Sequence, residues 1–257
     1  MIWTTRQRSD LGHGLAGIVA GDGPRVILLH GVGLRAEAWA PQIDALSRAH
    51  QVLAVDLPGH GDSDAGPGTL AEFAKRLMPL LDQPAVVAGH SFGAMLAAEL
   101  AQMTPDKVRG VALLNAIHRR DAAAAQAVQA RATALDGHGM ADPGPTLTRW
   151  FGAAPSPERA ACEDWLRKVD PAGYRAAYRV FASEDGPSDR TLDTLTVPAL
   201  FMTGADEPNS TPAMSRAMAA LAPKGRAVVL PGAAHMMPMT HPADVTAELE
   251  TLLEDCA

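Results

Sequence analysis

Gly89-His90-Ser91-Phe92-Gly93 is the stretch of this 257-residue sequence that says most about its fold. An apolar run at residues 85–89 leads into it, and a helical pattern at residues 92–103 follows it. A serine with this spacing lies on a sharp, strained turn from strand to helix, where only small residues fit two positions away. The stretch therefore predicts that Ser91 is a nucleophile. We also expect the N–H of Phe92, at the start of the helix, to face developing negative charge.

Apolar runs and helical patterns alternate outward from this turn. The predicted strands, each a short run of mostly apolar residues, are 25–30, 51–57, 85–89, 108–114, 197–203 and 226–230. The predicted helices are 36–46, 70–81, 92–103, 212–221 and 243–253. Strands separated by helices predict an α/β fold with a mostly parallel, doubly wound sheet.

The alternation stops between Ile117 and Arg190, where the sequence is helical and interrupted by prolines. We expect residues 117–190 to form a helical cap, or lid, inserted into a core made of residues 1–116 and 191–257. Open sheets of this class bind ligands at the carboxyl ends of their strands, and an insertion placed there would cover the ligand. A long excursion with only a structural role is the alternative.

A serine nucleophile needs a base, and His235 is the candidate among nine histidines. It follows the last predicted strand, on a loop that can reach over the edge of the sheet. His241 is its rival and could simply begin the last helix. His90 is expected to point away from the Ser91 hydroxyl, and His30 and His60 lie in Gly-rich turns that suggest structural roles.

The base in turn needs a carboxylate that orients it and stabilises its protonated form. Asp206 follows the penultimate strand in Thr203-Gly204-Ala205-Asp206, and we predict that it fills this role rather than its neighbour Glu207. The chain order Ser91, Asp206, His235 is then the order that hydrolases with this turn use.

A second Gly-rich turn, His30-Gly31-Val32-Gly33, ends the first predicted strand. Glycines let backbone N–H groups approach a ligand closely, so the N–H of Val32 is expected to join that of Phe92 in an oxyanion hole. A plain strand exit is the alternative reading. The predicted substrate contacts in and around the cavity are Gly31, Met95, Met140, Trp150, Trp165 and Met236.

Composition excludes several classes of protein. The formal net charge of −7, without a basic block, argues against a nucleic-acid partner. The sequence contains no run of 18 apolar residues, so no membrane span is predicted. The N-terminal stretch is polar and does not resemble a signal peptide, so a cytoplasmic location is expected. Cys162 and Cys256 are too few for a disulfide framework. Motifs for metals and for nucleotide cofactors are lacking, so we expect none to be bound.

The charge is unevenly distributed along the chain. Residues 117–190 contain ten Lys or Arg and ten Asp or Glu, so the whole net charge of −7 belongs to the remaining residues. A neutral, Arg-rich cap on an acidic body could dock an acidic acyl carrier protein or steer a carboxylate substrate. Solvated arginines balanced by nearby acids are the alternative.

Over nearly its whole length the sequence resembles the α/β-hydrolase superfamily. The resemblance rests on His30-Gly31, Asp56-Leu-Pro-Gly-His-Gly-Asp-Ser63, the Ser91 turn, Gly204-Ala-Asp206 and His235. Two branches look closest: the pimeloyl-acyl-carrier-protein methyl ester carboxylesterases and the 3-oxoadipate enol-lactonases. The chain departs from the carboxylesterases at Val32, where they typically have Trp.

This resemblance implies a serine hydrolase that cleaves a small carboxylic ester through an acyl-enzyme. Alternatives on the same three residues are an enol-lactone hydrolase and a C–C bond hydrolase. A non-catalytic ligand receptor on a hydrolase scaffold is a different class, which an intact set of catalytic residues disfavours.

Overall fold

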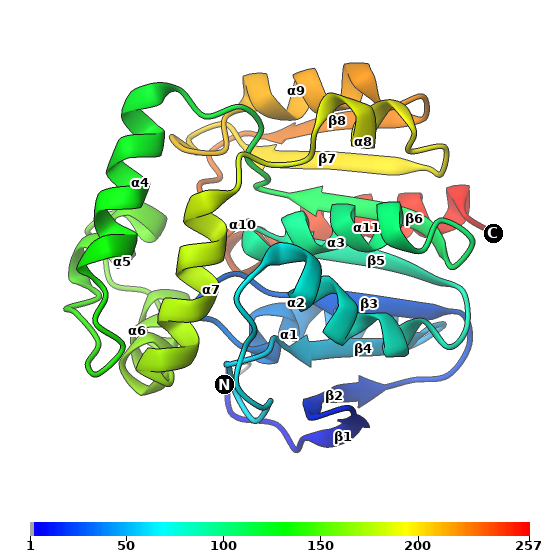
Figure 1. Cartoon of the computed structure of the whole chain (residues 1–257). Helices are drawn as coiled ribbons and strands as arrows, with labels where there is room; N and C mark the ends of the chain where they lie inside the picture. Colours follow the sequence, from blue (N-terminus) through cyan, green and yellow to red (C-terminus); the bar gives the residue numbers. More distant parts are fainter. Residues whose placement is uncertain (1–2) are drawn as a thin grey trace.

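One eight-stranded sheet organises the chain in the computed structural model, which describes residues 3–257 (Figure 1). Its strands lie in the order β1-β2-β4-β3-β5-β6-β7-β8. Their bounds are β1 Ser9–Gly12, β2 Leu15–Ala20, β3 Arg25–Leu29, β4 Gln51–Asp56, β5 Ala85–His90, β6 Val108–Leu114, β7 Ala199–Gly204 and β8 Gly225–Leu230. β1 pairs with β2 and β2 with β4 in antiparallel fashion, and every other pair is parallel. The predicted doubly wound α/β sheet is confirmed.

The N-terminal hairpin of β1 and β2 was not among the predicted strands. β1 is short and half-exposed, so it lacks the apolar run that marks the six predicted strands, whereas β2 has such a run and was missed. Its turn has left-handed backbone at Gly12, His13 and Gly14, as a tight hairpin requires. The hairpin covers the edge of β4, which would otherwise be open.

Two hydrophobic cores, one on each face of the sheet, explain the near-continuous apolar strands. In β3, Ile27 and Leu29 belong to one core, whereas Val26 and Leu28 belong to the other. This alternation is the period of two that a strand buried on both faces must show.

The helices divide between these faces. Side chains of α2 Leu70–Leu77, α3 Phe92–Met103, α8 Asp189–Asp193 and α9 Pro212–Leu221 enter one core. Those of the 3-10 helix Ala36–Trp39, α1 Ala40–Leu46, α10 Met237–Thr240 and α11 Pro242–Asp255 enter the other. A further 3-10 turn, Met78–Leu81, extends α2, so the predicted helices 36–46 and 70–81 each begin or end in this tighter geometry.

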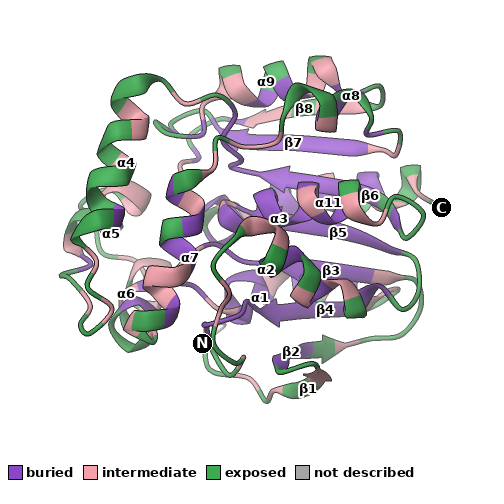
Figure 2. Cartoon of the chain, in the orientation of Figure 1, coloured by how far each residue is buried: buried purple, intermediate pink, exposed green. Residues whose placement is uncertain are grey.

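Four helices between β6 and β7 lie beyond the carboxyl ends of the parallel strands (Figure 1). They are α4 Ala122–Ala134, α5 Gly144–Phe151, α6 Pro157–Lys168 and α7 Pro171–Ser183, and we call them the cap helices. Their outer faces are exposed while the central strands, β3 to β7, are mostly buried (Figure 2). The predicted cap boundary at residue 190 falls inside α8, whose Leu192 lies in the core just after that boundary.

Among residues 3–257, no helix combines the length and the apolar character that crossing a membrane requires.

Candidate active site

Ser91 lies in the strained turn between β5 and α3. Its backbone has φ 57° and ψ −114°, a conformation that non-glycine residues rarely adopt. A Cβ on Gly89 would lie 2.0 Å from the carbonyl oxygen of Gly93, and a Cβ on Gly93 would lie 2.1 Å from that of Leu29. Only glycine fits at either position, so the two glycines permit the turn that exposes the Ser91 side chain.

Two backbone N–H groups beside Ser91 lack hydrogen-bond partners among the described residues. The N–H of Phe92 opens α3, where helix geometry provides no acceptor, and the N–H of Val32 belongs to the turn after β3. The Gly31 backbone approaches Ser91 so closely that a Cβ there would lie 3.2 Å from the serine Cβ. Both predicted oxyanion donors therefore lie beside the serine.

His30 and His60 hold the turn that carries Val32. The Nε2 atom of His60 accepts a hydrogen bond from the Gly33 N–H at 2.9 Å, and that of His30 accepts one from the Leu57 N–H at 3.0 Å. Complete burial keeps both rings neutral, lowering the pKa of His30 to about 3 and that of His60 to about 4. Their roles are structural, as predicted.

His235 is paired with Glu207. Its Nδ1 atom lies 2.9 Å from Oε2 of Glu207, while Oε1 of the same carboxylate accepts hydrogen bonds from the N–H groups of Asn209 and Ser210. Burial is the largest single influence on the pKa of Glu207 and raises it. The His235 charge and these hydrogen bonds together outweigh burial and hold the pKa at about 2. The carboxylate is thus ionised and fixes His235 with Nδ1 protonated and Nε2 free to accept a proton.

The prediction that Asp206 orients the base is wrong. Asp206 is exposed, whereas Glu207 is only 3% exposed and makes the contact with His235. The reason is the turn after β7, in which the Asp206 N–H donates to the Ala233 carbonyl at 2.9 Å. This backbone bond ties the turn to the loop that carries His235, and the next side chain along, not that of Asp206, points inward.

Ser91 and His235 line the same cavity. Among the described residues the Ser91 hydroxyl forms no hydrogen bond. Catalytic hydrogen bonds are often long in unliganded enzymes and tighten when substrate binds.

Two aromatic neighbours hold His235 in place. His90 donates from Nε2 to the carbonyl oxygen of His235 at 2.7 Å, and burial lowers the pKa of His90 to about 3, so this ring is neutral. Trp150, from cap helix α5, stacks on the His235 ring with centroids 5.5 Å apart. His90 therefore supports His235 from the core side and Trp150 covers it from the cap.

The cavity at Ser91 has a volume of about 220 Å³ and lies between the strand ends and the cap helices. Gly31 and Trp150 line it, as predicted. Met95 and Met236 do not, because both are almost fully buried in hydrophobic clusters, so their prediction as substrate contacts is corrected. Methionine is a common core filler, and its presence near a motif does not identify a pocket.

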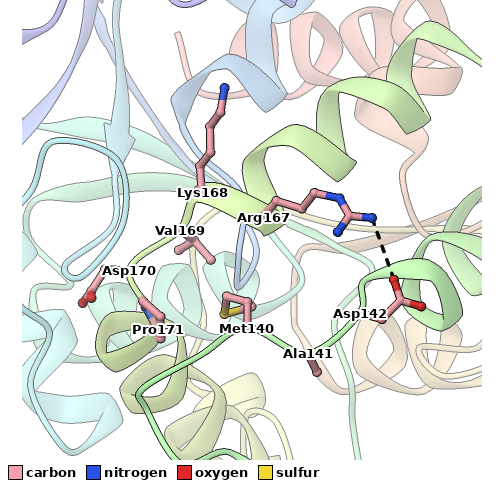
Figure 3. Close-up of a pocket in the computed structure, with 8 residues that line it drawn as sticks. All are labelled: Met140, Ala141, Asp142, Arg167, Lys168, Val169, Asp170 and Pro171. Carbon is pink, nitrogen blue, oxygen red and sulfur yellow. Dashed lines mark ion pairs between the residues drawn. The ribbon is translucent and has the colours of Figure 1, made fainter.

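Met140 and Trp165 are also misassigned. Met140 lines a separate surface pocket of the cap, near the ion pair between Arg167 and Asp142 (Figure 3). Trp165 packs in the cluster between the cap and the core and faces another pocket beside Arg35. Neither pocket contains Ser91 or His235.

The sequence analysis missed most of the polar lining of the cavity. Its polar and charged members outside the predicted set are Asn115, Arg120, Asp121, Arg131, Thr146, Arg149, Tyr174, Tyr178, Asn209, Ser210 and Thr211. All but Asn115 and the 209–211 segment come from residues 120–178. The Arg-rich composition of residues 117–190 was the only signal in the sequence that pointed to them.

Known proteins resemble the chain over nearly its full length. It is 38% identical over 243 residues to the (E)-2-((N-methylformamido)methylene)succinate hydrolase of Acinetobacter baylyi, covering 91% of this chain and 92% of that protein. It is 31% identical over 244 residues to a pimeloyl-[acyl-carrier protein] methyl ester esterase of Stenotrophomonas maltophilia, covering 90% and 93% respectively.

Among solved structures, the enol-lactonase of Burkholderia xenovorans superposes with a TM-score of 0.82 at 25% identity, covering 96% of this chain and all of that one. Both branches suggested by the sequence motifs are thus represented among its relatives. A family profile matches residues 26–249, which include Ser91, Glu207 and His235. From this match and the shared fold, the chain belongs to the alpha/beta hydrolase family.

Proposed function

We propose that this protein is a serine hydrolase that cleaves a small carboxylic ester through an acyl-enzyme. One observation carries the proposal: Ser91, in its strained turn, faces the same cavity as His235, whose Nδ1 is held by the buried carboxylate of Glu207. A nucleophile, a base and an orienting acid are the three groups that acyl transfer requires.

The proposed reaction has two halves. Ser91 Oγ attacks the ester carbonyl while His235 Nε2 takes the hydroxyl proton, and the N–H groups of Val32 and Phe92 bind the resulting oxyanion. Collapse breaks the C–O bond to the alcohol, which leaves with the proton from His235. Water then loses a proton to His235 and attacks the acyl carbon, releasing the acid and restoring the Ser91 hydroxyl.

A second candidate is an amide, favoured by the 38% identical relative. The compound in that protein's name is an N-formyl enamine built on a succinate, so it contains an amide carbonyl that the same residues could attack. An enol-lactone, by analogy with the Burkholderia enzyme, and a C–C bond substrate remain alternatives that use the same three residues.

Hydrolysis of p-nitrophenyl esters from acetate to octanoate tests the proposal, with Ser91→Ala as the inactive variant. Ser183→Ala is the matched control, because Ser183 lies on the exposed face of α7 and does not line the cavity. We expect Ser91→Ala to lose at least about 10³-fold in kcat while folding normally. Mass spectrometry after treatment with a fluorophosphonate should show one adduct on the wild type and none on Ser91→Ala.

Two results would count against the proposal. Wild-type turnover by Ser91→Ala would remove Ser91 from the chemistry. Tight ligand binding with neither turnover nor adduct formation would instead favour a receptor.

A further inference from the structure

The cavity at Ser91 is positively charged, although the protein as a whole has a net charge of −7. Three arginines, Arg120, Arg131 and Arg149, line it together with one acidic residue, Asp121. Each of these four residues must be assigned either to the fold or to a ligand.

Arg120 and Asp121 are used by the fold. The Arg120 side chain is 4% exposed, donates to the carbonyl oxygens of Phe181 and Glu184, and lies 4.5 Å from the centre of the Phe181 ring. Asp121 accepts the Ala124 N–H at 2.7 Å and caps the start of α4. Both side chains already have partners that fix the cap.

Arg131 and Arg149 hydrogen-bond only to neutral side chains. Arg131 Nη1 donates to the Tyr178 hydroxyl at 2.9 Å, and Arg149 Nη2 donates to the Thr146 hydroxyl at 3.2 Å. Neither guanidinium has a carboxylate within ion-pair distance in residues 3–257, whereas other arginines of the cap and core do. A guanidinium has five N–H donors, so most donors of both groups remain available to a ligand.

The two guanidinium groups also repel each other. Burial lowers the pKa of Arg149, and the charge of Arg131 lowers it further. Arg131 is exposed, so solvent screens this repulsion in part, and a bound anion would remove what is left of it. Both arginines line the same cavity as Ser91 and His235, so this positive region lies beside the proposed reacting groups.

We propose that Arg131 and Arg149 bind a free carboxylate of the substrate, so that the substrate is a short acid monoester or its amide counterpart. The inference rests on the proposed function for the identity of the bond that is cleaved. Tyr178 and Thr146 orient the guanidinium groups of Arg131 and Arg149. A planar guanidinium group can form two parallel hydrogen bonds to one carboxylate, a bidentate arrangement. The same cavity, of about 220 Å³, is lined by both arginines and by Ser91, so a small acid would occupy it with its carboxylate and its scissile carbonyl together.

The kinetic test compares monoethyl succinate with diethyl succinate, which has the same scissile ester but no charge, by titrating released acid at constant pH. The measured quantity is the ratio of kcat/KM for the anionic ester to that for the neutral ester. We expect this ratio to fall at least about tenfold in Arg131→Gln and in Arg149→Gln, since a charge-assisted hydrogen bond is lost in each. The ratio should fall less in Arg149→Lys, which keeps the positive charge but loses the planar pair of N–H donors of the guanidinium group.

Arg179→Gln is the matched control. Arg179 is an exposed arginine of cap helix α7 that does not line the cavity, and its replacement changes the net charge equally. Its ratio should match that of the wild type. An equal fall in Arg179→Gln would mean long-range steering and would overturn a direct carboxylate site.

A binding measurement separates this inference from the proposed function, because it does not depend on turnover. Calorimetric titration of Ser91→Ala with succinate should give a Kd that weakens at least about tenfold when Arg131→Gln or Arg149→Gln is added. Succinamide, the neutral analogue, should bind more weakly than succinate. This result would support the carboxylate site even if no ester were hydrolysed, whereas unchanged succinate affinity in both arginine variants would refute it.

Discussion

Replacing Glu207 by Gln isolates the role of the carboxylate in the candidate active site. In the wild type, Oε1 is anchored by the N–H groups of Asn209 and Ser210, and Oε2 lies 2.9 Å from His235 Nδ1. An amide oxygen can keep the first contact, so the loop should hold its shape. The amide nitrogen then faces Nδ1, which must become an acceptor, and the only proton of the ring moves to Nε2.

The resulting tautomer cannot take the proton of Ser91. The variant also lacks the negative charge that stabilises protonated His235 in the transition state. Removal of the equivalent carboxylate from serine hydrolases costs about 10⁴-fold in kcat. We therefore expect Glu207→Gln to lose about 10³–10⁴-fold, or roughly 4–5.5 kcal/mol of transition-state stabilisation.

Initial rates on p-nitrophenyl butyrate at pH 8, with circular dichroism to establish folding, measure this effect. Asp206→Asn is the paired control, because the Asp206 side chain is exposed and removing its charge should change kcat less than about threefold. If Asp206→Asn were the inactive variant and Glu207→Gln the active one, the assignment of the acid from the 2.9 Å contact would be refuted.

Two further predictions concern the other histidines. His90→Leu removes the 2.7 Å hydrogen bond to the His235 carbonyl and should lower kcat about tenfold with little change in KM. His90→Gln keeps a hydrogen-bond donor and should recover part of this loss. Equal kcat values for the two variants would show that this hydrogen bond does not position His235. The free energy of unfolding, measured by urea titration, should fall between pH 7.5 and pH 5, because His30, His60 and His90 are buried in neutral form while the unfolded chain gains protons below about pH 6.5. Each of the three histidines should lower the free energy of unfolding by about 2 kcal/mol at pH 5. A free energy of unfolding that stays constant over this range would contradict the assignment of neutral buried rings.

The sheet was largely predictable from the sequence because its strands are buried on both faces. Runs such as 25–30 and 108–114 are apolar at nearly every position, so they stand out without alignment or structure. In the N-terminal hairpin only β1 lacks this pattern, because it lies at the edge of the sheet and is partly exposed. β2 is a short apolar run, LAGIVA, that is largely buried, and the sequence analysis missed it.

The active site was predictable only where a backbone constraint leaves a mark in the sequence. The main chain around Ser91 packs so closely against neighbouring backbone that only glycine fits beside it, and these glycines are visible in the sequence. The choice between Asp206 and Glu207 depends instead on the direction in which a turn points two adjacent acidic side chains, and spacing alone does not encode that direction. Arg131 and Arg149 reach the cavity through the packing of α4 and α5 over the sheet, which no local pattern specifies.

The expected acyl-carrier partner remains a prediction.

The division between strand-end loops and cap helices has an evolutionary consequence. Ser91, Glu207 and His235 lie in loops directly after strands of the sheet. In contrast, Arg131, Arg149 and most of the other polar residues that line the cavity lie within one insertion, between β6 and β7. Mutations in that insertion can change which molecule is accepted without disturbing the strained turn or the base, so new specificities can arise by drift within a single segment. Relatives that keep the three strand-end residues while differing throughout residues 117–190 should therefore be expected to differ in substrate rather than in the steps of the reaction.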